Sequence, residues 1–123
     1  PMLDRGESKQ VALLPALDRT RMNNSRLAFG SAKLSRSKST KKISVPAGSF
    51  EVETFRVEGP EGVLNYYVEA AFPHRIIAWD GPSAERGELT GVARRKYWGE
   101  NREGDQAALK SLGLTNVGGL RAR

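Results

Sequence analysis

The chain has 123 residues, of which 20 are Lys or Arg and 14 are Asp or Glu, giving a formal net charge of +6. It contains no cysteine, which excludes disulfides, thiolate zinc sites, iron–sulfur clusters and thiol nucleophiles. The basic balance permits nucleic acid, an anionic membrane surface or an acidic protein as a partner, and does not choose among them. The length and composition indicate one domain over residues 1–123, with residues 1–10 and 115–123 expected to be mobile.

The first third of the chain predicts edge structure followed by a strand. Residues 1–10 are polar and unpatterned, as in a frayed or edge segment. Residues 11–17 are apolar but contain Pro15, which removes a ladder donor, so we expect an edge strand or a strapping loop. Apolar residues with small ones between them predict a strand over residues 27–34, and the polar residues 35–42 have the composition of an exposed hairpin loop.

The stretch Val-Pro-Ala-Gly at residues 45–48 raises the question of whether it holds a ligand or only turns the chain. Proline at the second position favours a type I turn, after which Gly48 takes a positive φ as a bulge residue. A turn therefore explains the motif without a ligand. The apolar alternation changes phase between Val52 and Phe55, so we expect either a bulge near Thr54 or two covered faces.

Glycine and proline divide the next part of the chain into further strands. The turns expected are residues 58–62, 73–74 and 80–83. The strands expected are residues 63–72, 75–79 and 88–98, the first with strict alternation.

Good helix formers after Asp105, with Lys110 near the end and Gly113 as a stop, predict a short helix over residues 105–112. The elements together predict a mainly β (α+β) fold of five to six antiparallel strands with a short C-terminal helix. No apolar run approaches the ~20 residues of a membrane-spanning helix. The first residues lack the apolar core of a signal peptide, and a chain that begins with proline is expected to be a processed product.

Catalytic and metal-binding patterns are weak. His74 is the sole histidine and follows a proline at a strand junction, which is an ordinary surface position. A metal site would add Glu69 and Asp80 to it, but their spacing matches no known ligand pattern. Glu51 and Glu53 fall on the same side of a strand, as glycosidase carboxylates can, yet such pairs are commonly solvated. We therefore expect no enzymatic activity, metal or cofactor.

Basic residues gather in two stretches that resemble a nucleic-acid surface, because cations stand beside the aromatic rings of Tyr97 and Trp98. These residues are Lys33, Arg36, Lys38, Lys41, Lys42, Arg94, Arg95 and Lys96. Glutamates are interspersed and no RNA-binding signature is present. A nucleic-acid-binding module is therefore the alternative function, and the same cations could face anionic lipid heads.

Large aromatic side chains most often fill the core or cap its edge in so small a domain. If they line the concave face of a curved sheet instead, they form an apolar groove for an acyl chain or a partner strand. The expected lining is Tyr66, Tyr67, Trp79, Tyr97 and Trp98, and the expected rim for an anionic headgroup is Arg94, Arg95 and Lys96. The function expected is a non-enzymatic binding or structural domain that holds a hydrophobic, lipid-like ligand or a partner protein.

Four segments between residues 27 and 89 carry a family resemblance. They are residues 45–52 (VPAGSFEV), 66–68 (YYV), 72–77 (FPHRII) and 87–89 (GEL). Their order resembles the uncharacterised bacterial β-rich domains with a VPAGTF hairpin, found mostly in exported proteins and lipoproteins; Ser49 stands where threonine is usual. The resemblance implies an antiparallel sheet curved toward a half-barrel, distantly similar to lipoprotein carriers, and an extracytoplasmic or periplasmic location. It implies no catalytic residues.

Overall fold

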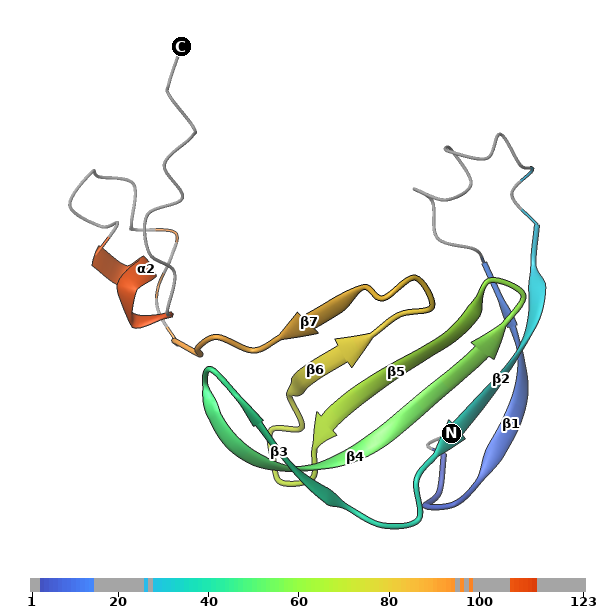
Figure 1. The fold of residues 1–123 in the computed structure, drawn as a ribbon, viewed down its shortest axis with the longest axis horizontal. Coiled ribbons are helices and arrows are strands. Elements are labelled where there is room, and N and C mark those ends of the chain that lie inside the picture. The colour runs from blue at the N-terminus through green and yellow to red at the C-terminus, as the bar shows by residue number, and fades with distance from the viewer. Residues whose placement is uncertain are drawn as a thin grey trace.

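The structure, a computed structural model, describes residues 3–14, 26, 28–94, 96, 98 and 107–112. These residues form one curved antiparallel sheet of seven strands that does not close into a barrel, and one short helix (Figure 1). The elements are β1 (Ser8–Leu13), β2 (Gly30–Arg36), β3 (Lys41–Val45), β4 (Gly48–Gly59), β5 (Gly62–Glu69), β6 (Ile76–Asp80), β7 (Arg86–Glu88) and α2 (Ala107–Ser111). The mainly β fold with a C-terminal helix is confirmed, with more strands than expected.

The strand order is β1-β2-β4-β5-β6-β7, and β3 lies beside β4 on the same edge as β2. The prediction of a hairpin loop over residues 35–42 is wrong, because β2 and β3 pair with β4 and not with each other. β4 is 12 residues long and so accommodates two strands end to end along one edge. The gap is bridged at Ser37, whose amide donates to Thr54 O at 2.9 Å and whose Oγ accepts from Thr54 N at 3.0 Å.

The Val-Pro-Ala-Gly stretch is the turn of the β3–β4 hairpin, as predicted. Val45 pairs with Gly48, so only Pro46 and Ala47 lie between the strands, and Gly48 has a φ of 132°. The register of this hairpin is unbroken, and the predicted glycine bulge is therefore absent from it. The Ala47 amide donates to Leu89 O at 3.0 Å, which ties the turn to the residue after β7. The Ala47 amide in the turn therefore has a hydrogen-bond partner within the protein and needs no ligand.

Cross-strand pairs point to one side of a sheet and successive residues alternate, so the register defines two faces. We call the cleft face the side that carries Val57, Leu64 and Trp79, and the other side the opposite face. At the predicted phase change, Val52 and Glu53 are both buried, and the β4–β5 register runs through without a shift. Of the two alternatives, covering of both faces is therefore correct.

On the opposite face, cationic side chains lie over a small apolar cluster. Val52 is fully buried there. The Lys41 Nζ atom lies 4.3 Å from the ring centroid of Tyr67, and the Arg75 guanidinium carbon lies 5.7 Å from that of Phe50. Such cations are attracted to the ring faces while their aliphatic stems cover apolar surface. Long basic side chains thus take the place of a second layer on this face.

The N-terminal segment belongs to the sheet instead of fraying. β1 begins at Ser8 and is an edge strand, which is one of the two alternatives for residues 1–10 and 11–17; residues 1, 2 and 15–17 lie outside the described residues. Leu3 is buried, and the amide of Gly6 donates to Arg36 O at 3.0 Å. Local composition did not indicate this, because the partners of the segment lie about thirty residues further along the chain.

The predicted strand over residues 88–98 is wrong for the described residues after Glu88; residues 95 and 97 lie outside the described residues. β7 ends at Glu88, and the Leu89 amide donates to Ile77 O at 2.9 Å as the last contact with β6. Thr90 Oγ1 donates to Leu112 O at 2.8 Å, which places Thr90 beside the residue that follows α2. A short α2 agrees with the helix predicted at residues 105–112, of which 105 and 106 lie outside the described residues.

Candidate functional site

An open cleft of about 710 Å³ lies on the cleft face of the sheet, at the end where the β4–β5 turn approaches β1. The described residues that line it are Leu13, Leu14, Ala28, Gly30, Val57, Gly59, Pro60, Glu61, Gly62, Leu64, Trp79, Pro82 and Glu85. Small-molecule sites typically have volumes of about 300–1,000 Å³ and mostly apolar walls. The cleft has both properties.

The floor of the cleft comes from strand pairing. Val57 of β4 pairs with Leu64 of β5, and both point to the cleft face. Leu13 at the end of β1 forms one wall and, like Leu14, is 45% exposed. Leucines in a small domain usually pack into its core, so adjacent exposed leucines beside an apolar floor mark surface that a ligand could bury.

Two glycines shape the other walls by close approach. A Cβ on Gly62, whose φ is 118°, would lie 2.5 Å from Pro82 Cβ, so glycine lets the β4–β5 turn pack against the loop before β7. A Cβ on Gly87 would lie 2.1 Å from Trp79 Nε1, so the indole rests on the bare backbone of β7. Together these contacts hold Pro82 and Trp79 at the cleft.

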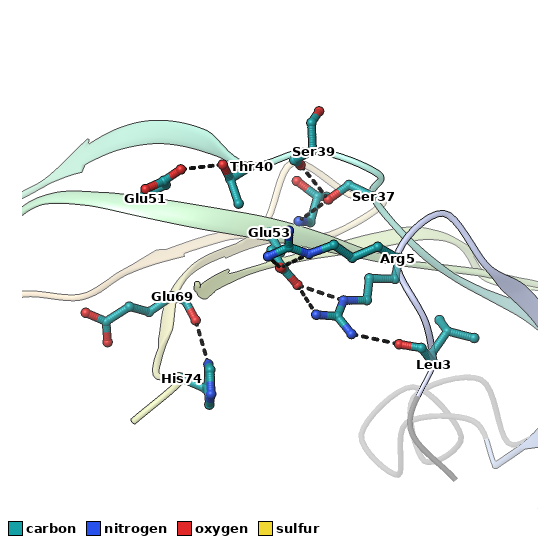
Figure 2. A network of polar contacts seen from close by, with 11 residues as sticks. Leu3, Arg5, Ser37, Ser39, Thr40, Glu51, Glu53, Glu69 and His74 are labelled. Atoms are coloured by element: carbon teal, nitrogen blue, oxygen red, sulfur yellow. Dashed lines mark hydrogen bonds and ion pairs between the residues drawn. The ribbon is translucent and has the colours of Figure 1, made fainter. Parts of the chain in front are cut away.

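The far end of the cleft face carries a polar network on Glu53 (Figure 2). Arg5 Nε and Arg36 Nε each donate to one carboxylate oxygen of Glu53 at 2.7 Å. Arg36 Nη1 also donates to Leu3 O at 2.8 Å, which holds the N-terminal segment against this part of the sheet. In the described part of the chain, every buried side-chain nitrogen and oxygen has a hydrogen-bond partner. Arg5 and Arg36 therefore contact Glu53 at one end of the cleft face, and the cleft lies at the other end.

The residues predicted from the sequence as a groove lining are only partly brought together. Trp79 lines the cleft, and Tyr66 pairs with it across β5 and β6 on the same face. Tyr67 points to the opposite face, where its Oη donates to Asp80 Oδ2 at 2.6 Å. Trp98 is exposed and does not line the cleft, whereas Tyr97 lies outside the described residues.

The predicted basic rim is not at the cleft. Arg94 and Lys96 are exposed and absent from its lining, and Arg95 lies outside the described residues. The charged lining residues that the structure describes are Glu61 and Glu85. The floor pair was missed from the sequence. Counting outward from the predicted turn at residues 58–62 pairs Val57 with Val63, whereas the two-residue turn of the structure pairs Val57 with Leu64.

Tyr67 offers a test of the polar contacts on the opposite face. The hydrogen bond to Asp80, together with burial and the charge of Asp80, raises the pKa of Tyr67. We expect Asp80→Asn to lower the Tyr67 pKa toward its ordinary value, because an amide does not stabilise the protonated phenol as the carboxylate does. Alkaline absorbance titration measures this, with Tyr67→Phe identifying which transition belongs to Tyr67. An unmoved transition in Asp80→Asn would contradict the assignment.

The candidate catalytic residues are either exposed, as His74 is, or hydrogen-bonded to other residues, as Glu51 and Glu53 are. His74 is exposed at the β5–β6 connection, with Nδ1 3.1 Å from Glu69 O. Glu51 accepts a hydrogen bond from Thr40 Oγ1, while both oxygens of Glu53 contact arginines. Among the described residues, no three His, Asp or Glu side chains gather closely enough to hold a metal ion. None of the described helices has the length and apolar character to span a membrane.

Several arginines form ion pairs with carboxylates. Among the described residues, arginines that form ion pairs with glutamates include Arg5, Arg36, Arg56, Arg75 and Arg86. An arginine already paired with a carboxylate is a weaker ligand for a phosphate, since the existing pair must be broken first. Of the basic residues named for the nucleic-acid alternative, Arg36 is paired in this way, so the ion pairs leave that alternative untested.

Comparison of the chain with models of known families, with curated proteins and with solved structures found no match. The resemblance of the VPAG hairpin to exported bacterial domains therefore stays a prediction. The cleft has to be interpreted from its own chemistry.

Proposed function

We propose that the protein is a non-enzymatic binding domain that holds an apolar ligand in the cleft beside Val57, Leu64 and Trp79. The observation that supports the proposal is a cleft of about 710 Å³ whose walls are mostly apolar and whose leucines are half exposed. Burying such surface is favourable by about 25 cal/mol per Å². A ligand with an alkyl chain would gain this energy from Leu13, Leu64 and Trp79 together.

The single-layer fold supports the same proposal. A sheet is stable when each face is covered by another layer or by side chains. The opposite face has Lys41 and Arg75 over its rings, and one end of the cleft face has the network on Glu53. Among the described residues, the other end of the cleft face exposes apolar side chains, and a ligand would cover them. An extracytoplasmic location is proposed with this function, on the resemblance of residues 45–52 to exported domains.

The test is a titration with Nile red, an uncharged apolar dye, comparing Leu64→Ser with Val63→Ser. Val63 is the neighbouring residue of β5 on the opposite face, so it is a matched control. We expect Leu64→Ser to weaken binding about tenfold, because a hydroxyl replaces an apolar contact, and Val63→Ser to leave it unchanged. Circular dichroism confirms that both variants fold. Absence of dye binding, or equal binding by both variants, would overturn the proposal.

A further inference from the structure

The β5–β6 connection presents apolar side chains to solvent. Phe72 is 88% exposed, more than any other large hydrophobic residue that the structure describes. Pro73 and Ile76 are exposed beside it in the sequence, and we call these three residues the apolar tip. Turns favour glycine, proline, asparagine, aspartate and serine, so a phenylalanine is not required to make this turn.

Hydrogen bonds hold the connection in one shape. The amide of His74 donates to Ala71 O at 2.9 Å, which closes the turn around Phe72. His74 Nδ1 lies 3.1 Å from Glu69 O (Figure 2), and Arg75 donates two hydrogen bonds of 2.8 Å to the Glu69 carboxylate. A loop that is already ordered loses little conformational entropy when it binds.

Two lysines lie at the same end of the sheet as the apolar tip. The amide of Ala70 donates to Glu51 O at 2.9 Å, and Glu51 pairs across strands with Lys42, so Lys42 is two strands away from the start of the turn. Lys41 precedes it, and both lysines are exposed. The Glu51 carboxylate accepts a hydrogen bond from Thr40 Oγ1. In the described part of the chain, neither lysine forms an ion pair with a carboxylate.

An apolar tip beside cations suits the surface of an anionic bilayer. The apolar side chains enter the interface, and each nearby lysine is attracted to negatively charged headgroups, by about fivefold in affinity. A stable protein interface buries about 800 Å² on each partner, which is much more than one four-residue turn provides. A bilayer, in contrast, accepts a protruding side chain without a pocket of matching shape.

We propose that the apolar tip docks the protein on an anionic lipid bilayer, with Phe72 in the interface and Lys41 and Lys42 at the headgroups. This contact goes beyond the proposed function and does not depend on it. The cleft lies at the β4–β5 turn, at the other end of the sheet (Figure 1). Glu51 and Gly59 mark these two ends of β4 and are about 27 Å apart along the strand, so a docked protein keeps its cleft away from the bilayer.

The test measures flotation of the protein with vesicles of phosphatidylcholine alone or with about one third phosphatidylglycerol. We expect binding to the anionic vesicles. Phe72→Ser should weaken it about tenfold or more, and Phe72→Leu should retain it, because an apolar side chain is lost in the first and kept in the second. Phe29→Ser is the matched control and should bind like the wild type. Phe29 is 73% exposed but precedes Gly30, which packs against Pro60 of the β4–β5 turn.

Lys42→Gln tests the charge of the surface and should reduce the preference for anionic over neutral vesicles about fivefold. Lys33→Gln is its control, because Lys33 is also exposed but pairs across strands with Glu58, toward the other end of the sheet. Circular dichroism confirms that the variants fold.

Absence of binding to the anionic vesicles, or equal binding by Phe72→Ser and Phe29→Ser, overturns the proposal. Equal binding of the wild type to neutral and anionic vesicles overturns the choice of an anionic surface. Self-association that light scattering detects in the wild type but not in Phe72→Ser, without vesicle binding, would show that the apolar tip contacts a second copy and would also overturn the proposal.

Discussion

Replacing Glu53 with glutamine is expected to lower the free energy of unfolding by about 3 kcal/mol. Glu53 is 5% exposed and receives a pair of contacts from each of Arg5 and Arg36. The variant leaves Arg36, whose side chain is only 20% exposed, without its anionic partner. An uncompensated buried charge is costly, so most of the loss comes from Arg36 and little from the more exposed Arg5.

Urea denaturation of the wild type and the variant measures this loss as a lower midpoint at unchanged slope. Glu51→Gln is the control, since Glu51 is on the same strand but exposed, and its change should stay within about 0.5 kcal/mol. If Glu53→Gln were as mild as Glu51→Gln, the network would contribute nothing measurable to stability.

The difference in stability between the wild type and Glu53→Gln should depend on pH. Burial would raise the pKa of the Glu53 carboxyl, but the hydrogen bonds and charges of Arg36 and Arg5 outweigh burial and lower the pKa. A lowered folded pKa gives stability that is present above the unfolded value of about 4.3 and is lost as the pH falls through the folded value. The difference between wild type and Glu53→Gln should therefore narrow in acid. Glu69 and Asp80, whose pKa values are also lowered, contribute equally to both proteins and cancel.

Ile77→Ala is expected to cost about 3 kcal/mol of unfolding free energy, and Ile76→Ala less than about 1 kcal/mol. The two positions form a matched pair, because the residues are identical and adjacent while Ile77 is 0% and Ile76 is 53% exposed. The difference arises at a register shift, where Tyr67 pairs with Ala78 but Val68 pairs with Ile76, leaving Ile77 as an extra residue in β6. Deleting buried methyl groups leaves a cavity, whereas trimming an exposed side chain does not.

Thermal or urea unfolding of both alanine variants measures the two changes in unfolding free energy. Equal costs would mean that both isoleucines share the core, and a larger cost at Ile76 would mean that the bulge is placed one residue away. Either result would contradict the β5–β6 register.

The strands that the sequence predicted well are those whose evidence is local. Alternation over residues 63–72 led to β5, and the Pro-Gly signals on either side of β4 led to two turns that the structure contains. Alternation along β5 also contradicts the groove lining that was predicted from the aromatic residues. Tyr66 and Tyr67 are consecutive in a strand, so they point to opposite faces and cannot both line one cleft.

Other features could not be predicted, because they depend on residues far apart in the chain. Nothing local shows that β2 and β3 share one edge of β4, or that β7 ends after three residues. The burial of Glu53 follows from Arg5, which is 48 positions away. A polar residue pattern predicts exposure, and only the partner guanidinium groups reverse that expectation.

The sequence by itself determined that this protein is a mainly β domain with proline and glycine turns and no thiol chemistry, because composition and alternation act over a few residues. The tertiary structure alone decided where the cleft lies. Leu13, Leu64, Trp79 and Glu85 come from four separate parts of the chain, and strand order, register and the contacts of Gly62 and Gly87 bring them together.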